Sequence, residues 1–177
     1  MTYLPSIYKS TPQQVTITAG GTAAIAAVDT NYSRLTLLGF QSSNAGGVVD
    51  PNQIRVSFNS TTQLVASGQG SVYVLVEEFN PLFFRQAFQH GNVTIPSGGT
   101  SVTTPHGLTL GSKACVGWRG SLSGRGNSPS VPLNLTEAQV RPRLQLSGAN
   151  IIATVGQVDY FDGTGTVVVG YTLMDPR

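Results

Sequence analysis

Two histidines, His90 and His106, are the residues of this sequence that most readily suggest catalysis. A histidine acts as a general base when a nucleophile or a carboxylate lies beside it. His90 precedes Gly91 and His106 lies in the run TTPHG, so each is interpreted as a solvated or turn histidine. The sequence also lacks the G-x-S-x-G nucleophile elbow. We therefore expect no catalytic residues and predict that the chain is not an enzyme.

The acidic residues do not form a metal site. Asp159 and Asp162 in DYFDGTG lack the alternating acidic ligands of a calcium loop, and Asp-Gly before Thr-Gly is typical of a tight turn. The C-x-x-C and H-x-x-x-H spacings are absent. Glu77 and Glu78 are adjacent, so a strand projects them to opposite faces and they cannot act as a pair. We expect no metal-binding residues, no cofactor-binding residues and no cofactor.

The segment RGSLSGRGNSPSVP, Arg119–Pro132, is rich in glycine and almost free of apolar residues. A long polar loop in a β module is either mobile or a contact arm, and both interpretations stay open. Arg119 and Arg125 could bind a carboxylate or a phosphate of a partner. The segment is not a phosphate-binding loop, because no Lys-Ser/Thr pair and no helix start follow it.

The composition restricts the partners. Charged residues make up 10% of the chain, against about 25% in typical globular proteins, so Ser, Thr, Asn, Gln and Gly must form the surface. Such a surface suits a protein that lies against other subunits, and also a secreted or fibrous β protein. A net charge of +2 is too small for a dedicated nucleic-acid binder. We expect no nucleic-acid partner.

The sequence favours a protein made in a cytoplasm. The start, MTYLPSIYKS, lacks the pattern of a signal peptide, and no apolar stretch approaches the roughly 20 residues that span a bilayer. We expect no membrane partner. The single cysteine, Cys115 in KACVGW, excludes an internal disulfide and is predicted to be a small buried hydrophobic residue.

Alternating runs rich in Val, Ile and Thr, separated by Gly and Asn-Ser-Thr clusters, predict an all-β fold with ten strands. The predicted strands are Gln14–Thr18, Leu35–Phe40, Gln53–Phe58, Gln63–Ser67, Ser71–Phe79, Asn92–Ile95, Lys113–Trp118, Val140–Leu146, Ile151–Val155 and Thr166–Leu173.

The two sets of five strands are copies of each other. VTITAGGT matches VTIPSGGT at an offset of 78 (93 − 15), and the same offset aligns LLGF with CVGW, so that Phe40 meets Trp118. QLVAS matches NIIAT at 87 (150 − 63), and SVYVLVEEFNP matches TVVVGYTLMDP at 95 (166 − 71). We predict two tandem homologous small antiparallel β-sandwich or barrel modules.

The repeat divides the chain into four parts. An N-terminal arm covers residues 1–12, module 1 covers 13–81, a connector covers 82–91 and module 2 covers 92–177. A module of this size buries only about 60% of the surface of its unfolded chain and is marginal alone. Each module is therefore expected to pack on its twin, on another subunit, or on both.

The arm and the connector supply interface candidates. Phe83, Phe84 and Phe88 are too apolar for a free linker, so they pack between the modules or dock into a partner. The spacing of Phe84 and Phe88 allows a short helical turn. The arm lies on its own module or along a neighbouring subunit. Its interface candidates are Tyr3, Leu4 and Tyr8.

The run IRVSFNSTTQLVASGQGSVYVLVEEF resembles a phrase of structural proteins of tailed-bacteriophage virions: strand, Ser-Thr-Thr turn, strand, Gly turn, and a strand that ends Val-x-x-Glu-Phe. The second copy departs from it, with SGANI at the turn and TLM in place of EEF. The resemblance implies a head-decoration or tail accessory protein that is assembled in the host bacterial cytoplasm. Its partners are then other virion proteins, such as major capsid or tail proteins, and copies of itself.

Three functions follow for testing. The first is decoration or cementing of the capsid surface. The second is a tail, neck or fibre-base component that recognises the host through Arg119–Pro132. The third is a carbohydrate-binding β-sandwich with a host surface glycan as ligand. Trp118 would be its stacking residue, although its apolar run favours a place in the core.

Overall fold

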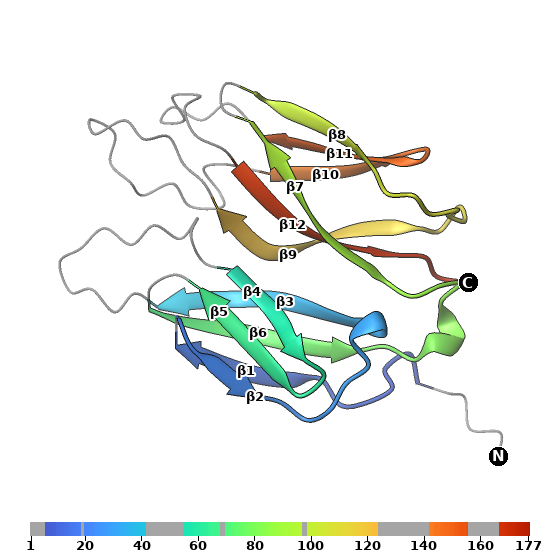
Figure 1. Cartoon of the computed structure of the whole chain (residues 1–177). Coiled ribbons are helices and arrows are strands. Elements are labelled where there is room, and N and C mark those ends of the chain that lie inside the picture. The colour runs from blue at the N-terminus through green and yellow to red at the C-terminus, as the bar shows by residue number, and fades with distance from the viewer. Residues whose placement is uncertain are drawn as a thin grey trace, which may run out of the picture.

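The computed structural model describes seven stretches of the chain, and within them it forms twelve β-strands and no α-helix (Figure 1). Two short 3₁₀ turns, Thr30–Tyr32 and Pro81–Phe83, are the helical elements of this part. The predicted all-β class is therefore confirmed. The described residues are 6–18, 20–41, 55–67, 70–96, 99–123, 142–155 and 167–177.

The first half of the chain consists of two three-stranded antiparallel sheets, with orders β1-β6-β3 and β2-β5-β4. Its strands are β1 (Gln13–Thr18), β2 (Thr22–Ala24), β3 (Ser33–Gln41), β4 (Arg55–Ser60), β5 (Gln63–Ser67) and β6 (Ser71–Glu78).

The second half repeats this arrangement strand for strand, with orders β7-β12-β9 and β10-β11-β8. The two tandem modules predicted from the repeat are therefore present as two similar halves. The strands are β7 (Gln89–Ile95), β8 (Ser101–Pro105), β9 (Cys115–Ser123), β10 (Pro142–Ser147), β11 (Asn150–Val155) and β12 (Val167–Met174).

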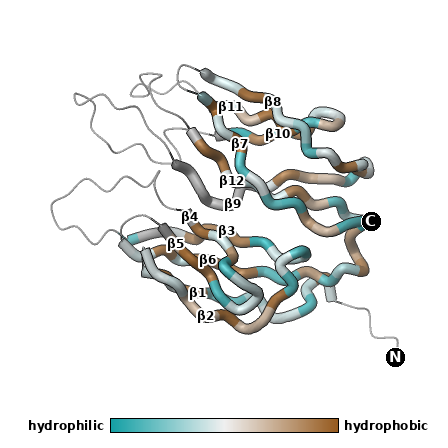
Figure 2. The backbone as a smooth tube through the Cα atoms, in the orientation of Figure 1, coloured by the Kyte–Doolittle hydropathy of each residue, from teal (hydrophilic) through white to brown (hydrophobic). Residues whose placement is uncertain are grey.

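Each half has its own hydrophobic core, formed by alternate residues of its strands. In β6, Val72, Val74 and Val76 are buried while Tyr73 and Leu75 are half-buried, which is the period of two that a strand imposes. The β-branched residues of these strands pack well on a pleated surface. Figure 2 shows the hydrophobic residues interspersed along the strands of both halves. The core of the second half contains Val93, Ile95, Ile151, Ala153, Val169, Tyr171 and Leu173.

The two halves lie side by side, and β9 of the second half contacts β3 and β4 of the first (Figure 1). Cys115 begins β9, which is an outer strand of its sheet, and it is exposed. The prediction that Cys115 is buried was therefore wrong.

One strand in each half, β2 and β8, was not predicted from the sequence. Both are short, with Val102 as their one strongly hydrophobic side chain, and only alternate residues are half-buried, so they lack the apolar alternation that reveals a strand. They occupy corresponding places in the two sheets, because β2 pairs with β5 and β8 pairs with β11. The repeat unit therefore has six strands rather than five.

The alignment of LLGF with CVGW was wrong by at least five residues. Val76 and Tyr171 correspond at the offset of 95 (171 − 76), and their strand partners are Leu35 and Trp118. Leu35 therefore corresponds to Trp118, an offset of 83 (118 − 35) rather than 78. The short Gly-containing match misled the alignment, because hydrogen-bond register and not residue identity decides which residues correspond.

Candidate interaction surface at the junction of the halves

The described part of the arm pairs with the end of β6 in the same module. The amide of Asn80 donates to the carbonyl oxygen of Ile7 at 2.8 Å, and the amide of Lys9 donates to that of Glu78 at 3.0 Å. Tyr8 and Phe79 form an antiparallel bridge between these bonds. Residues 7–9 therefore pack on their own module, which was one of the two interpretations of the arm. Tyr3 and Leu4 lie outside the described residues.

The arm covers a buried carboxylate, Glu77, whose side chain is 5% exposed. The Tyr8 hydroxyl donates to its Oε1 at 3.0 Å. Arg34 donates to its Oε2 through Nε and Nη2 at 2.9 and 2.7 Å, and Thr36 donates to the same oxygen at 3.0 Å. The Tyr8 bond to this carboxylate raises the pKa of Tyr8. A buried carboxylate needs such partners, so Glu77 holds the arm and β3 together.

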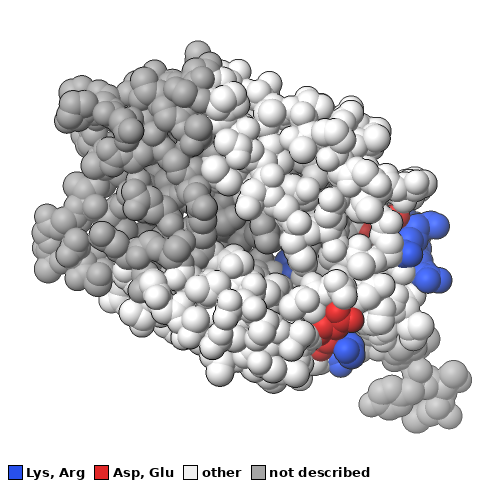
Figure 3. Space-filling model, in the orientation of Figure 1, with Lys and Arg blue, Asp and Glu red and all other residues white. Residues whose placement is uncertain are grey.

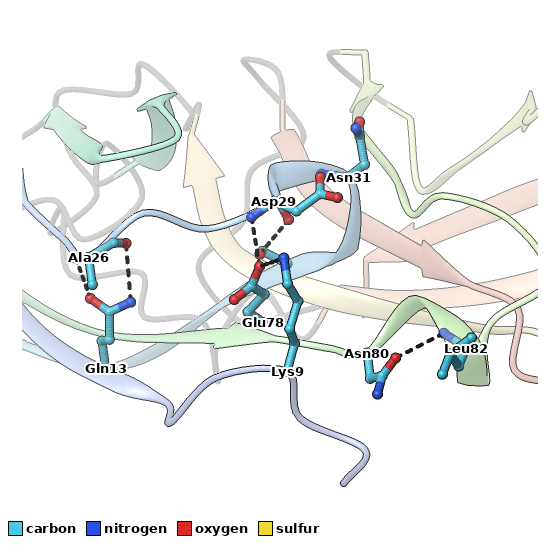
Figure 4. Close-up of polar contacts among 9 residues, drawn as sticks. Lys9, Gln13, Ala26, Asp29, Asn31, Glu78, Asn80 and Leu82 are labelled. Atoms are coloured by element: carbon cyan, nitrogen blue, oxygen red, sulfur yellow. Dashed lines mark hydrogen bonds and ion pairs between the residues drawn. The ribbon is translucent and has the colours of Figure 1, made fainter. Parts of the chain in front are cut away.

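The adjacent carboxylate, Glu78, has a separate set of partners (Figure 4). Lys9 Nζ lies 2.8 Å from its Oε1, and the amide of Asp29 donates to the same oxygen at 2.9 Å. Burial alone would raise the pKa of Glu78, but hydrogen bonds from Lys9, the Asp29 amide and Ser10 outweigh it and lower this pKa. Sequence analysis missed this role. The signal was available: two acids in succession at the end of an otherwise apolar strand.

The connector packs its aromatic rings between the two halves. Phe84 and Phe88 are buried, with ring centroids 4.6 Å apart at 82°, and both rings contact Phe79 at the end of β6. Met174 at the end of β12 belongs to the same cluster, and Phe83 is half-buried against it. Of the two interpretations, packing between the modules therefore describes Phe84 and Phe88. The helical turn occurs earlier, at Pro81–Phe83, where the Asn80 side chain accepts from the amide of Leu82 at 3.1 Å (Figure 4).

The connector pairs with the end of β12 as the arm pairs with the end of β6. Phe84 and Pro176 form an antiparallel bridge. The amide of Arg85 donates to the carbonyl oxygen of Asp175 at 2.8 Å, and that of Arg177 donates to the carbonyl oxygen of Phe83 at 2.9 Å. Each half therefore includes a leading segment that closes it. The strand β7 begins at Gln89, within the residues predicted as connector.

Both histidines have structural partners. His106 follows the end of β8 and is 3% exposed, so it is not solvated. Its Nδ1 accepts from the amide of Leu108 and its Nε2 donates to the carbonyl oxygen of Gly148, both at 3.1 Å. His90 is half-buried, and its Nε2 donates to the carbonyl oxygen of Thr30 in the first half at 3.1 Å. Its Nδ1 then accepts from the hydroxyl of Thr172 at 2.9 Å, so His90 links the two halves.

An apolar groove of about 280 Å³ opens where the arm, the connector and the end of β12 meet. Ile7 at its edge is 50% exposed, and Leu82, beside Phe83 in the chain, is 69% exposed. We call this surface the junction groove. It is lined by Ile7, Phe79, Phe83, Phe84, Met174, Pro176 and Arg177.

Cations surround one side of the junction groove. Arg177 lines it, and Lys113 Nζ donates to the carbonyl oxygen of Arg177 at 3.2 Å. Arg85 is 52% exposed, with Nε 3.8 Å from Oδ1 of Asp175, and that carboxylate is buried. Figure 3 shows Lys and Arg side chains gathered at the end of the molecule where Figure 1 places the C-terminus. The exposed charge around Asp175 is therefore positive.

Several predicted site residues lie wholly or partly outside the part of the chain that the structure describes. Arg119 lies in β9, but its side chain is outside the described part, as is that of Trp118. Arg125, Asp159 and Asp162 lie outside the described residues altogether. In the described part, no group of three His, Cys, Asp or Glu side chains could hold a metal ion. No helix of that part is long and apolar enough to cross a membrane.

The architecture defines a class: a tandem pair of β-sandwiches, each closed by a leading segment, joined through an aromatic cluster. Comparison of the chain with protein families, with characterised proteins and with solved structures finds no match.

Proposed function

We propose that this chain is a non-enzymatic structural protein of a tailed-bacteriophage virion that decorates or cements the capsid surface. The observation that supports the proposal is the junction groove, which is lined mostly by apolar residues and includes the half-exposed side chain of Ile7. Burying apolar surface contributes roughly 25 cal/mol per Å², so a contiguous apolar surface favours contact with a partner.

The junction groove suits attachment because its walls are fixed. The arm and the connector are hydrogen-bonded to the strand ends, and Phe84 and Phe88 are packed between the halves. A preformed surface loses little conformational entropy on binding. A shell repeats the same contact at every equivalent position, so a modest contact is sufficient when many copies bind. Under this proposal, the partners are other virion proteins and copies of this chain.

The test is binding to mature heads that lack the protein. Addition of the purified chain should produce co-sedimentation with the heads and raise the temperature at which they release DNA. Ile7→Asp should reduce binding, because it places a charge at the groove. Leu38→Asp is the matched control, since Leu38 is also 50% exposed but lies in β3 and does not line the groove. Heads whose heat resistance is equal with and without the protein would remove this proposal.

A tail, neck or fibre-base role is the second candidate, and the direction in which β9 runs favours it. Cys115 of β9 pairs with Met174 at the groove, whereas Ser123 of β9 pairs with Val168 at the opposite end. The chain between β9 and β10 therefore leaves from the end remote from the groove, so one end could anchor while the other meets the host. Deletion within residues 124–141 should then abolish adsorption and leave particles intact. Normal adsorption would remove this candidate.

No observation favours the carbohydrate-binding candidate. Sugar sites use exposed aromatic rings. The exposed large hydrophobic side chains of the described residues are Ile7, Leu38 and Leu82, all aliphatic.

A further inference from the structure

We propose that the junction groove binds an extended segment of the shell protein that carries a carboxylate next to apolar side chains. This inference rests on the proposed attachment to a virion and specifies the chemistry of the partner.

The apolar lining of the junction groove favours a ligand with apolar side chains. Six of its seven residues are apolar, and Phe79, Phe84 and Met174 form the buried base while Ile7 remains half-exposed at the edge. A groove of about 280 Å³ accommodates one or two side chains rather than a folded domain. An extended segment fits such a site, because it inserts side chains without a large complementary face.

The cations at the rim of the junction groove favour a ligand with a carboxylate. Arg177 and Lys113 are exposed, and Arg85 is half-exposed. The side-chain carboxylate among their described contacts is that of Asp175, which is buried and whose Oδ2 accepts from the amide of Gly111 at 2.9 Å. The side chains of the rim therefore carry more positive than negative charge. Cations beside an apolar groove are complementary to an acidic partner.

The described part of a second copy fits the groove less well. Its arm is apolar, but residues 1–12 contain Lys9 and no acidic residue, since Asp29 is the first acid of the sequence. The carboxylates of the described residues are also withdrawn: Glu77, Glu78 and Asp175 are buried and Asp29 is half-buried. A carboxylate supplied by another chain therefore suits the rim better than those that the described part of a second copy presents.

The experiment uses the full-length protein with a photo-crosslinking residue in place of Ile7, bound to purified mature heads. Mass spectrometry then identifies the cross-linked segment. In parallel, Lys113→Glu should weaken head binding by about tenfold, because it reverses a charge of the rim. Arg143→Glu is the matched control, since Arg143 is exposed on β10 and does not line the groove, and it should leave binding unchanged.

The outcomes separate the two proposals. A cross-link to a shell segment with Asp or Glu beside apolar residues, together with a selective effect of Lys113→Glu, supports the inference. If the unmodified protein binds the heads and the two charge reversals change binding equally, the inference is overturned and the proposed function stands. A cross-link to residues 1–5 of this chain, to a second copy, or to a segment without acids also overturns it. Absence of head binding by the unmodified protein overturns both proposals.

Discussion

Lys9 Nζ lies 2.8 Å from Glu78 Oε1, and this ion pair connects the arm to the strand that completes the first half. Glu78 is 3% exposed, whereas the side chain of Lys9 is 52% exposed. The buried partner therefore depends on the arm for its charge balance. Loss of a partner leaves a buried carboxylate uncompensated, so the arm stabilises the first half as well as covering it.

The first prediction concerns acid. The lowered pKa of Glu78 means that its ionised form stabilises the fold. This contribution is complete above the ordinary pKa of 4.5 and is lost as pH falls through the lowered folded-state value. The difference in free energy of unfolding between the natural protein and Glu78→Gln should therefore be constant from pH 7 to 5 and shrink below pH 4.5, in urea titrations. A difference that grows in acid would contradict the pairing.

The second prediction concerns the aromatic cluster. Phe88→Ala should cost about 3–5 kcal/mol in free energy of unfolding, because Phe88 is 6% exposed and its ring contacts Phe84, Phe79 and Tyr32. Leu82→Ala in the same segment is the control and should change stability by less than about 0.5 kcal/mol, since Leu82 is 69% exposed. Calorimetry of Phe88→Ala should also resolve two transitions in place of one. Equal stability of the two variants would refute packing between the halves.

The third prediction uses two glycines that lie in strands. A Cβ on Gly91 would lie 2.5 Å from Cζ and Oη of Tyr171, whose ring is buried in the second core. Gly91→Ala should therefore destabilise the protein by about 1–3 kcal/mol. A Cβ on Gly39 would meet no atom within 4 Å, so Gly39→Ala should be nearly neutral. Thermal melts of the two variants make the comparison, and a neutral Gly91→Ala would show that the Tyr171 ring lies elsewhere.

The fourth prediction separates the two bonds of His106. His106→Ala leaves the carbonyl oxygen of Gly148 and the amide of Leu108 without a side-chain partner, at a cost of about 1–3 kcal/mol. His106→Asn can still accept from Leu108, because its side-chain oxygen has the reach of Nδ1. We expect the asparagine variant to recover part of the loss in denaturant unfolding. No difference between alanine and asparagine would indicate that the Leu108 bond contributes nothing.

The fold was predictable from sequence because the internal repeat reveals the two halves and the alternation of apolar and polar residues reveals most strands. Gln63–Ser67 was predicted to the residue, and nine further strands were found with shifted ends. β2 and β8 were not predicted, since strands of three and five residues with one strongly hydrophobic side chain between them show no hydrophobic period. The error at Phe40 and Trp118 arose because residue identity is a weaker guide than register.

The interaction surface was predictable only in part. Phe84 and Phe88 were singled out by their hydrophobicity, but two interpretations remained, because sequence does not reveal which chain covers a ring. The groove itself depends on the pairing of residues 7–9 and 83–85 with strand ends about 70 and 90 residues away, a contact that no local pattern encodes. Once the pairing of one leading segment is known, the tandem repeat suggests the pairing of the other, since each half needs a segment to close it.

The most direct test of the proposed function is electron microscopy of virions that carry this protein with a visible label. Attachment to the capsid predicts label distributed over the head surface, and loss of that label when Ile7→Asp replaces the natural chain. Label confined to the neck or tail, or particles without label, would contradict it.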